Sequence, residues 1–345
     1  MSKTILITGG LGFIGSNFIR LFLKAHPSCH IINLDKLTYS ANPENLMDLS
    51  SNPQYHFIQG DIMDEALLHQ IGRDFPIQAV VHFAAESHVD RSISGSREFI
   101  QTNVLGTHTL LEVFKRYWDD TLGKDPSFRF LNISTDEVYG TLGLEGHFTE
   151  QTAFKPNSPY SASKAGADLL VRAYFETYGF PILIVRPSNN YGPYQFPEKF
   201  IPLMITNLLE DRPIPVYGRG ENIRDWLFVE DACQAIDQVL FKGRPGEAYN
   251  IGGESERSNI EVARQVLSFL KKGEEFLQFV TDRPGHDLRY ALSNAKIKKE
   301  IGWHPTVNFS EGLTRTIQWY QDQGQWWKPL KERLQEESKG FWSKS

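Results

Sequence analysis

Short apolar runs alternate with amphipathic segments along the first half of the chain. The runs have the length of strands and cover residues 3–8, 30–34, 55–59, 79–83, 128–134 and 182–186. Between them, apolar side chains recur at helical spacing, which predicts helices near 14–25, 65–71 and 96–118 and another across 162–171. Alternation of this kind favours a parallel sheet covered on both faces, so we expect an α/β fold with a doubly wound sheet.

The pattern changes after Arg186. Prolines interrupt the following segment at positions 187, 193, 197, 202, 213 and 215, and the later apolar runs are shorter. We expect residues 1–186 to form a larger lobe, to which the chain returns around 228–250. Residues 187–330 then form mainly a smaller C-terminal α/β lobe, and residues 331–345 form a C-terminal tail.

Composition narrows the classes of protein that the chain can belong to. The 345 residues carry a formal net charge of −6, which gives no sign of a nucleic-acid surface. Hydrophobic content of 40% is ordinary for a globular protein, and no apolar stretch approaches the length of a membrane span. Cys29 and Cys233 are the only cysteines, and no signal peptide is visible, so we expect reduced thiols and a cytoplasmic location. The ten histidines are scattered, and no metal site is predicted.

A glycine turn follows the first predicted strand. Gly9, Gly12 and Gly15 have the spacing G-x-x-G-x-x-G and stand between residues 3–8 and an amphipathic helix. Strand, glycine turn and helix in this order are typical of a Rossmann-type dinucleotide site, in which the pyrophosphate lies at the helix N-terminus. Asp35 follows the second strand, twenty residues after Gly15. An acid there accepts hydrogen bonds from a ribose diol and repels a 2′-phosphate, so NAD is favoured over NADP.

Other polar or small residues also stand at the ends of predicted strands. Asp61, Ala84-Ala85 and Ser134-Thr135 follow three further strands. Ligands bind outside the carboxyl ends of the strands in such sheets, so we expect these residues to meet in one crevice with Asp35. For Asp61, the alternative is a helix N-cap before Glu65.

Tyr160 and Lys164 lie four residues apart in a segment rich in helix formers, so both side chains share one helical face. A lysine cation and an oxidised nicotinamide ring near the phenol would favour the phenolate, which could then act as a base. The ordinary alternative is a surface tyrosine and lysine on an amphipathic helix. The glycine turn and Asp35 favour the catalytic interpretation, in which the pair helps to remove a hydride.

Two adjacent carboxylates, Asp136 and Glu137, follow Thr135 at a strand end. The ordinary alternative is a turn, where aspartate is common. Beside Tyr160 and Lys164, the pair instead suggests an oxidation that enables an elimination, with no net redox change. For that chemistry one carboxyl must be protonated and the other ionised, and the residues alone do not tell which is which.

Several longer motifs extend the likeness to a known family. They are Thr8–Asn17, Ala84–Ser92, Ser134–Gly140, Ser158–Lys164, Ser188–Tyr194, Arg224–Trp226 and Asp282–Asp287. Over nearly its whole length the chain resembles the extended short-chain dehydrogenases that act on nucleotide sugars, most closely their 4,6-dehydratases. Related epimerases carry small or hydroxylated residues in place of the carboxylate pair.

The resemblance implies an NAD-dependent lyase that removes water from a nucleoside-diphosphate hexose, with dTDP-glucose as the expected substrate. C4 is oxidised, water is eliminated across C5 and C6, and the hydride returns to C6. The resemblance assigns Tyr160 to the C4 hydroxyl proton, Thr135 to the C4 oxygen, Glu137 to the C5 proton and Asp136 to the departing C6 hydroxyl. It also places Lys164 on the nicotinamide ribose.

The resemblance also implies the contacts of both ligands. The cofactor contacts are Gly9, Gly12, Phe13, Ile14, Gly15, Asp35, Asp61, Ile62, Ala84, Ala85, Tyr160 and Lys164. The substrate contacts are Ser87, His88, Asn189, Lys199, Arg224, Asn259, Arg283 and His286, each of which could instead be an ordinary structural polar group. By the same analogy, helix 96–118 and the Tyr160 helix form a homodimer through a four-helix bundle, with neither nucleic acid nor membrane as a partner.

Three alternatives stay open at this point. UDP-glucose or UDP-N-acetylglucosamine could replace dTDP-glucose, because Pro187 stands where the family usually has a cysteine or another small residue. An epimerase could use the same scaffold without elimination. A non-catalytic NAD-binding sensor is disfavoured, since the four residues Asp136, Glu137, Tyr160 and Lys164 are all present.

Overall fold

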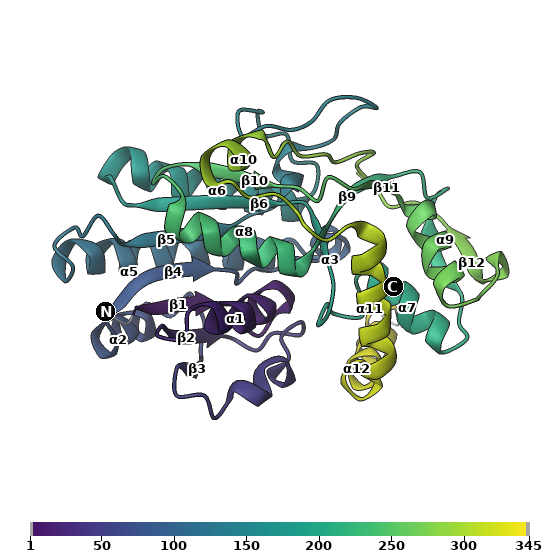
Figure 1. Cartoon of the computed structure of the whole chain (residues 1–345), viewed down its shortest axis with the longest axis horizontal. Helices are drawn as coiled ribbons and strands as arrows, with labels where there is room; N and C mark the ends of the chain where they lie inside the picture. Colours follow the sequence, from purple (N-terminus) through teal and green to yellow (C-terminus); the bar gives the residue numbers. More distant parts are fainter. Residues whose placement is uncertain (1–2, 343–345) are drawn as a thin grey trace.

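A seven-stranded sheet forms the centre of the larger lobe in the computed structural model (Figure 1). The structure describes residues 3–342, without the side chains of residue 335 and residues 337–342. In spatial order the strands are β10 (Ala248–Ile251), β6 (Ile182–Pro187), β5 (Arg129–Ile133), β4 (Ile77–His82), β1 (Thr4–Thr8), β2 (His30–Asp35) and β3 (Tyr55–Gln59). All neighbouring pairs are parallel, which confirms the predicted Rossmann-type, doubly wound α/β fold.

Helices cover both faces of this sheet (Figure 1). One face packs against α1 (Phe13–Ala25), α8 (Val229–Lys242) and α10 (Ala295–Ile301). The other face packs against α2 (Glu65–Asp74), α5 (Thr107–Asp120) and α6 (Pro159–Tyr178). Successive side chains of a strand point to opposite faces, so Ile5 and Ile7 join the first core and Leu6 joins the second. Burial on both sides explains why the strands read as continuous apolar runs.

The helix predicted near 96–118 is not a continuous α-helix. It begins as α4 (Arg97–Phe99), widens into the π-helix η2 (Ile100–Gly106) and continues as α5 to Asp120. Within the π-helix, the Asn103 side chain donates to the Ser163 hydroxyl at 2.8 Å and to the Glu86 carbonyl at 3.0 Å. The irregular turn therefore joins α6 to the loop after β4, a common use of π-helical turns at functional sites.

The smaller lobe has its own core. Its elements are β7 (Asn189–Tyr191), α7 (Phe200–Leu209), β8 (Ile214–Tyr217), β9 (Ile223–Phe228), β11 (Glu256–Ser258), α9 (Asn259–Phe269), β12 (Leu277–Val280), α11 (Phe309–Asp322) and α12 (Gly324–Trp342). Fully buried side chains such as Met204, Val266 and Ile317 pack between the helices and the two small sheets. Between β9 and β11 the chain passes through the larger lobe as α8 and β10. The boundary drawn at residue 330 falls inside α12, so residues 331–342 belong to a helix.

Candidate active site

A cavity of about 310 Å³ opens at the carboxyl ends of the central strands. Its wall includes every residue predicted to contact the cofactor, namely Gly9, Gly12, Phe13, Ile14, Gly15, Asp35, Asp61, Ile62, Ala84, Ala85, Tyr160 and Lys164. Ser87 and Lys199, two of the predicted substrate contacts, line the same cavity. The residues come from segments up to 190 positions apart, so only the sheet topology brings them together.

The glycine turn packs closely against the loop after β4. Gly9 has a φ of +72°, and a Cβ there would lie 2.5 Å from the Ala84 backbone nitrogen. A Cβ on Gly15 would lie 2.4 Å from the Gly9 carbonyl oxygen, so neither position accommodates a side chain. Gly12 forms the N-terminus of the thirteen-residue α1 and faces the cavity. This cradle fits a dinucleotide pyrophosphate, whose charge matches the helix N-terminus.

The carboxylates of Asp35 and Asp61 line the cavity. Asp35 is buried, and its two oxygens accept backbone N–H bonds from Leu11 at 3.0 Å and Leu37 at 2.9 Å. Burial raises the pKa of Asp35 from its ordinary value, and these two bonds oppose the shift. Asp61 forms an ion pair with Lys36 at 2.7 Å.

The N-cap of α2 is Asp64, whose side chain accepts the Leu67 N–H at 3.0 Å. The alternative that made Asp61 the cap of this helix is therefore wrong, because the helix begins three residues further on than that role requires. Asp61 is left on the cavity wall, where its side chain accepts the Met63 N–H at 3.0 Å.

The helix that carries Tyr160 and Lys164 begins at a well-formed cap. The Ser158 hydroxyl accepts the Ser161 N–H at 3.0 Å, the Ser161 hydroxyl bonds back to Ser158, and Pro159 occupies the first turn. Tyr160 and Lys164 are both buried and share the face that meets the cavity. The Lys164 ammonium donates to the Ile133 carbonyl at 2.7 Å, and burial lowers the pKa of Lys164 to about 8.

The chain by itself does not stabilise a Tyr160 phenolate. Burial raises the pKa of Tyr160 from its ordinary value, and the nearby Glu137 carboxylate raises this pKa further. A hydrogen bond with Thr135 lowers the pKa without cancelling those effects. Lys164, which was expected to lower the pKa of Tyr160, donates its ammonium to a backbone carbonyl instead and is not among the causes that act on this pKa. Use of Tyr160 as a base at neutral pH thus depends on the positive nicotinamide ring, which was expected to act together with Lys164.

The two adjacent carboxyls stand in different environments. They begin the short helix η3 (Asp136–Tyr139), whose N-cap is Thr135. Burial raises the pKa of Asp136 well above its ordinary value, and the charges of Glu137 and Asp225 raise it further. Burial also raises the pKa of Glu137, but the cations of Arg283, Arg224 and Lys199 oppose that shift. Asp136 is therefore suited to hold a proton and Glu137 to be ionised, a separation that acid–base pairs require.

Cations of the smaller lobe surround Glu137. Arg224 is buried and donates to the carbonyls of Ile223 at 2.8 Å and Asp287 at 2.9 Å, with its guanidinium 4.3 Å above the Tyr290 ring. The Lys199 ammonium donates to the Ser87 carbonyl at 3.0 Å, across the junction between the lobes. Guanidinium and ammonium groups held this way form a group of cations that suits a diphosphate, and we call this region the substrate pocket.

The other predicted substrate contacts have varied local roles, and none of His88, Asn189, Asn259 and His286 lines the cavity described above. His88 caps α3 (Val89–Ser94), and burial lowers the pKa of His88 to about 3, so its imidazole is neutral. The Asn189 side-chain oxygen is buried and, among residues 3–342, has no hydrogen-bond partner. Asn259 begins α9, where its backbone N–H donates to the Asn222 carbonyl at 2.9 Å. His286 contacts the Asp282 carboxylate at 2.6 Å.

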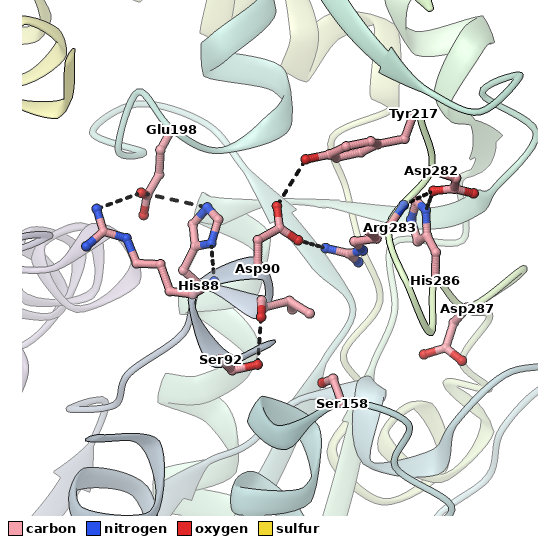
Figure 2. Close-up of polar contacts among 12 residues, drawn as sticks. His88, Asp90, Ser92, Ser158, Glu198, Tyr217, Asp282, Arg283, His286 and Asp287 are labelled. Carbon is pink, nitrogen blue, oxygen red and sulfur yellow. Dashed lines mark hydrogen bonds and ion pairs between the residues drawn. The ribbon is translucent and has the colours of Figure 1, made fainter. Parts of the chain in front are cut away.

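Sequence reasoning missed two residues of this site, Asp90 and Tyr217. Figure 2 shows Asp90 between the Tyr217 hydroxyl and the Arg283 guanidinium, which belong to the other lobe. Asp90 lies within a motif that carried the resemblance, but nothing in its local pattern indicates a partner 193 residues away. Tyr217 ends a four-residue strand and has no sequence signal of its own.

Comparisons with known proteins agree with this geometry. The family model described as GDP-mannose 4,6 dehydratase matches residues 6–316. A dTDP-glucose 4,6-dehydratase from Xanthomonas campestris pv. campestris is 51% identical over 335 residues, which cover 94% of each chain. The crystal structure of such an enzyme from Bacillus anthracis, in complex with NAD, is 49% identical and gives a TM-score of 0.88 over 95% of this chain and 100% of that chain.

A further solved relative carries ligands in addition to the cofactor. The dTDP-glucose 4,6-dehydratase from Streptomyces venezuelae, with NAD and a dTDP ligand bound, is 47% identical. Its TM-score is 0.89, over 95% of this chain and 99% of that chain. On the family model and these identities, the chain belongs to the GDP-mannose 4,6 dehydratase family of the short-chain dehydrogenases, and within it to the dTDP-glucose 4,6-dehydratases.

Proposed function

We propose that this protein is an NAD-dependent hydro-lyase that converts dTDP-glucose into dTDP-4-keto-6-deoxyglucose and water. The observation that carries the proposal is the pair Asp136 and Glu137, whose environments differ and whose charges act on Tyr160, a residue that lines the dinucleotide cavity. Hydride removal alone would not need two carboxyls. The named relatives, near 50% identical over nearly the full chain, support the same substrate for this chain.

The residues that line the cavity suit NAD. Gly9, Gly15 and the N-terminus of α1 would hold the pyrophosphate, and Asp35 would accept hydrogen bonds from the adenosine ribose. When bound, the nicotinamide would supply the hydride acceptor for oxidation at C4 and the hydride donor for reduction at C6. Lys164 holds the nicotinamide ribose, and its bond to the Ile133 carbonyl fixes the ammonium for that contact.

Tyr160 removes the proton of the C4 hydroxyl in this scheme. Thr135 assists Tyr160 at the C4 oxygen. The Thr135 hydroxyl forms a hydrogen bond with Tyr160 and also lies 3.3 Å from an Asp136 oxygen. Burial of Tyr160 keeps water away from the transferred proton. The product of this step is a 4-ketone, which makes the hydrogen at C5 an α-proton.

Glu137 and Asp136 then carry out the elimination. Glu137, with its charge favoured by Arg283 and Arg224, abstracts the C5 proton. Asp136, with its proton retained by burial and by neighbouring carboxylates, protonates the C6 hydroxyl, which leaves as water. When the hydride is delivered to C6, Glu137 returns its proton to C5, and the proton held by Tyr160 replaces the one that Asp136 gave to the leaving water, so protons balance over the cycle.

Product analysis tests the proposal. Purified protein is incubated separately with dTDP-glucose, UDP-glucose and UDP-N-acetylglucosamine, and each product is examined by mass spectrometry. We expect the loss of one water from dTDP-glucose. Loss of water from a UDP-sugar alone would keep the reaction and contradict the substrate, whereas an unchanged mass with all three would contradict 4,6-dehydration.

We also propose a homodimer and a cytoplasmic location. Leu105 and Leu169 expose 48% and 57% of their surface on neighbouring helical segments of the larger lobe, where a partner helix pair could cover them. None of the helices described here is both long and apolar enough to cross a bilayer. The free, buried thiols of Cys29 and Cys233 support a reducing compartment. Light scattering that shows only a 39.5 kDa species would contradict the dimer.

A further inference from the structure

The short helix α3 links the two lobes through one carboxylate. Asp90 accepts a hydrogen bond from Arg283 Nη1 at 2.8 Å through one oxygen and from the Tyr217 hydroxyl at 3.2 Å through the other (Figure 2). Tyr217 ends β8, and Arg283 lies in the loop after β12. A single side chain of the larger lobe therefore fixes two separate segments of the smaller lobe.

Neighbouring contacts place this link beside the substrate pocket. On the same helix and its cap, Arg91 and His88 approach the Glu198 carboxylate at 3.5 and 3.7 Å. Directly before the cap, the Ser87 carbonyl accepts from Lys199, which lines the cavity. Asp90 therefore belongs to a polar junction where the two lobes meet beside the cavity.

The Arg283 guanidinium has hydrogen-bond donors at this junction that Asp90 does not use. Its Nη1 is engaged by Asp90, whereas its Nε is buried and, within the described part of the chain, has no hydrogen-bond partner. A guanidinium carries five N–H groups in a rigid fork, so fixing one edge also fixes the direction of the others. A buried donor without a partner is costly, which favours a ligand oxygen in that position.

We propose that Asp90 is a positioning residue, which holds the Arg283 guanidinium in the orientation that receives the diphosphate of the nucleotide sugar. This inference rests on the proposed function. Asp90 itself has the same sign of charge as the diphosphate, so its direct effect on binding is repulsive. Across a solvated opening that repulsion is worth about threefold in affinity, whereas release of an arginine side chain costs about tenfold. The positioning effect therefore dominates.

Titration of the purified NAD-loaded protein with dTDP tests the inference. We expect Asp90→Asn to raise the dTDP dissociation constant and the KM for dTDP-glucose about tenfold, while bound NAD stays near the wild-type value. Tyr217→Phe, which removes only one of the two bonds to Asp90, should raise both constants about threefold. An Asp90→Asn protein with wild-type KM and dissociation constant would overturn the inference.

The chain offers a matched control in Glu300. Its carboxylate also accepts from an arginine, Arg244 at 2.8 Å, and from a tyrosine hydroxyl, Tyr249 at 3.0 Å, but it lies on α10 away from the cavity. Glu300→Gln therefore removes the same kind of ion pair without touching the site. We expect it to leave dTDP binding unchanged, and an equal loss in this variant would overturn a specific role for Asp90.

A double-mutant cycle separates positioning from a general structural effect. If Asp90 acts through Arg283, then Asp90→Asn should cause no further loss of dTDP binding in an Arg283→Ala background. A full tenfold loss in that background would overturn the inference. A failure of the proposed function would show separately, because the wild-type protein would then leave dTDP-glucose unchanged.

Discussion

The cofactor cavity and the substrate pocket adjoin each other but are built in different ways. Around the cavity, several cofactor contacts are placed by strand ends, because the glycine turn follows β1, Asp35 is the last residue of β2 and Ala84 lies two residues after β4. Around the pocket, side chains are held by other side chains or by distant carbonyls, as with Arg283 on Asp90 and Lys199 on Ser87. The first region depends on backbone shape and the second on pairs of charges.

This difference decides how each region responds to change. A substitution in the glycine turn acts sterically, since a Cβ on Gly9 meets backbone atoms that have nowhere to move. A substitution in the pocket changes the electrostatics of several neighbours at once, because Glu137 is influenced by Arg283, Arg224 and Asp287 together. We therefore expect effects in the pocket to be coupled and effects in the turn to be local.

The largest effect should come from Glu137→Gln, which breaks the chemistry in the pocket and leaves the cavity intact. We expect turnover to fall by about 10²–10⁴-fold, the usual contribution of a general base. C4 oxidation should continue, so nicotinamide absorbance should rise after dTDP-glucose is added and then persist. Full turnover without such a rise would contradict the assignment of Glu137 as the base.

Gly9→Ala should distort the cofactor cavity and lower NAD affinity without changing the residues of the substrate pocket. The added methyl group would lie 2.5 Å from the Ala84 nitrogen at a φ of +72°, so the turn must shift away from the pyrophosphate. We expect about a hundredfold loss of NAD affinity, from a strain of roughly 2–3 kcal/mol. Gly123→Ala is the control, since its φ is +56° but nothing lies within 4 Å of the added Cβ. Calorimetry on protein stripped of cofactor measures both.

Asp35→Ala should weaken NAD binding less than Gly9→Ala does, and it also acts in the cofactor cavity. The carboxylate offers hydrogen bonds to the adenosine ribose, and its loss should weaken NAD binding about tenfold. The KM for dTDP-glucose at saturating NAD should stay the same, because the pocket does not use this residue. If calorimetry gave an unchanged NAD dissociation constant, Asp35 would have no part in ribose recognition.

Asp225→Asn should give the smallest effect, a shift in the pH dependence of activity that tests the electrostatic control of Asp136. Asp225 is buried with a pKa of about 6, so it is charged above pH 7, and its charge raises the pKa of Asp136. Asp136 acts in its protonated form, so activity falls as pH rises through its pKa. Without the Asp225 charge this fall should begin at lower pH, by up to about one unit.

The pH profile of kcat measures this shift. The acidic limb reports the ionisation of Glu137 and should move little in Asp225→Asn, because Glu137 is governed mainly by burial and by the smaller-lobe cations. An alkaline limb that stays in place in this variant would exclude Asp225 from the control of Asp136.

Local sequence predicted the larger lobe well and the smaller lobe poorly. The six predicted strands lie within two residues of β1 to β6, since apolar runs of strand length separated by amphipathic helices are strong signals. The strands β7, β11 and β8 have only three or four residues, too few for a periodic pattern. The π-helix was also missed, because its wider turn is fixed by the contacts of Asn103 and not by propensity.

The sequence by itself determined the cofactor fold and the chemical groups of the site. The glycine spacing, Asp35, Tyr160 with Lys164, and the adjacent carboxyls are all local patterns, and a local pattern fixes what a single strand or helix presents. Only the tertiary structure distinguishes the carboxyl that is better suited to hold a proton. That choice depends on the burial of Asp136 and on charges from Asp225 and Arg283, which are distant in sequence. Desolvation and Coulomb energy depend on distances in space, and those exist only once the two lobes have come together.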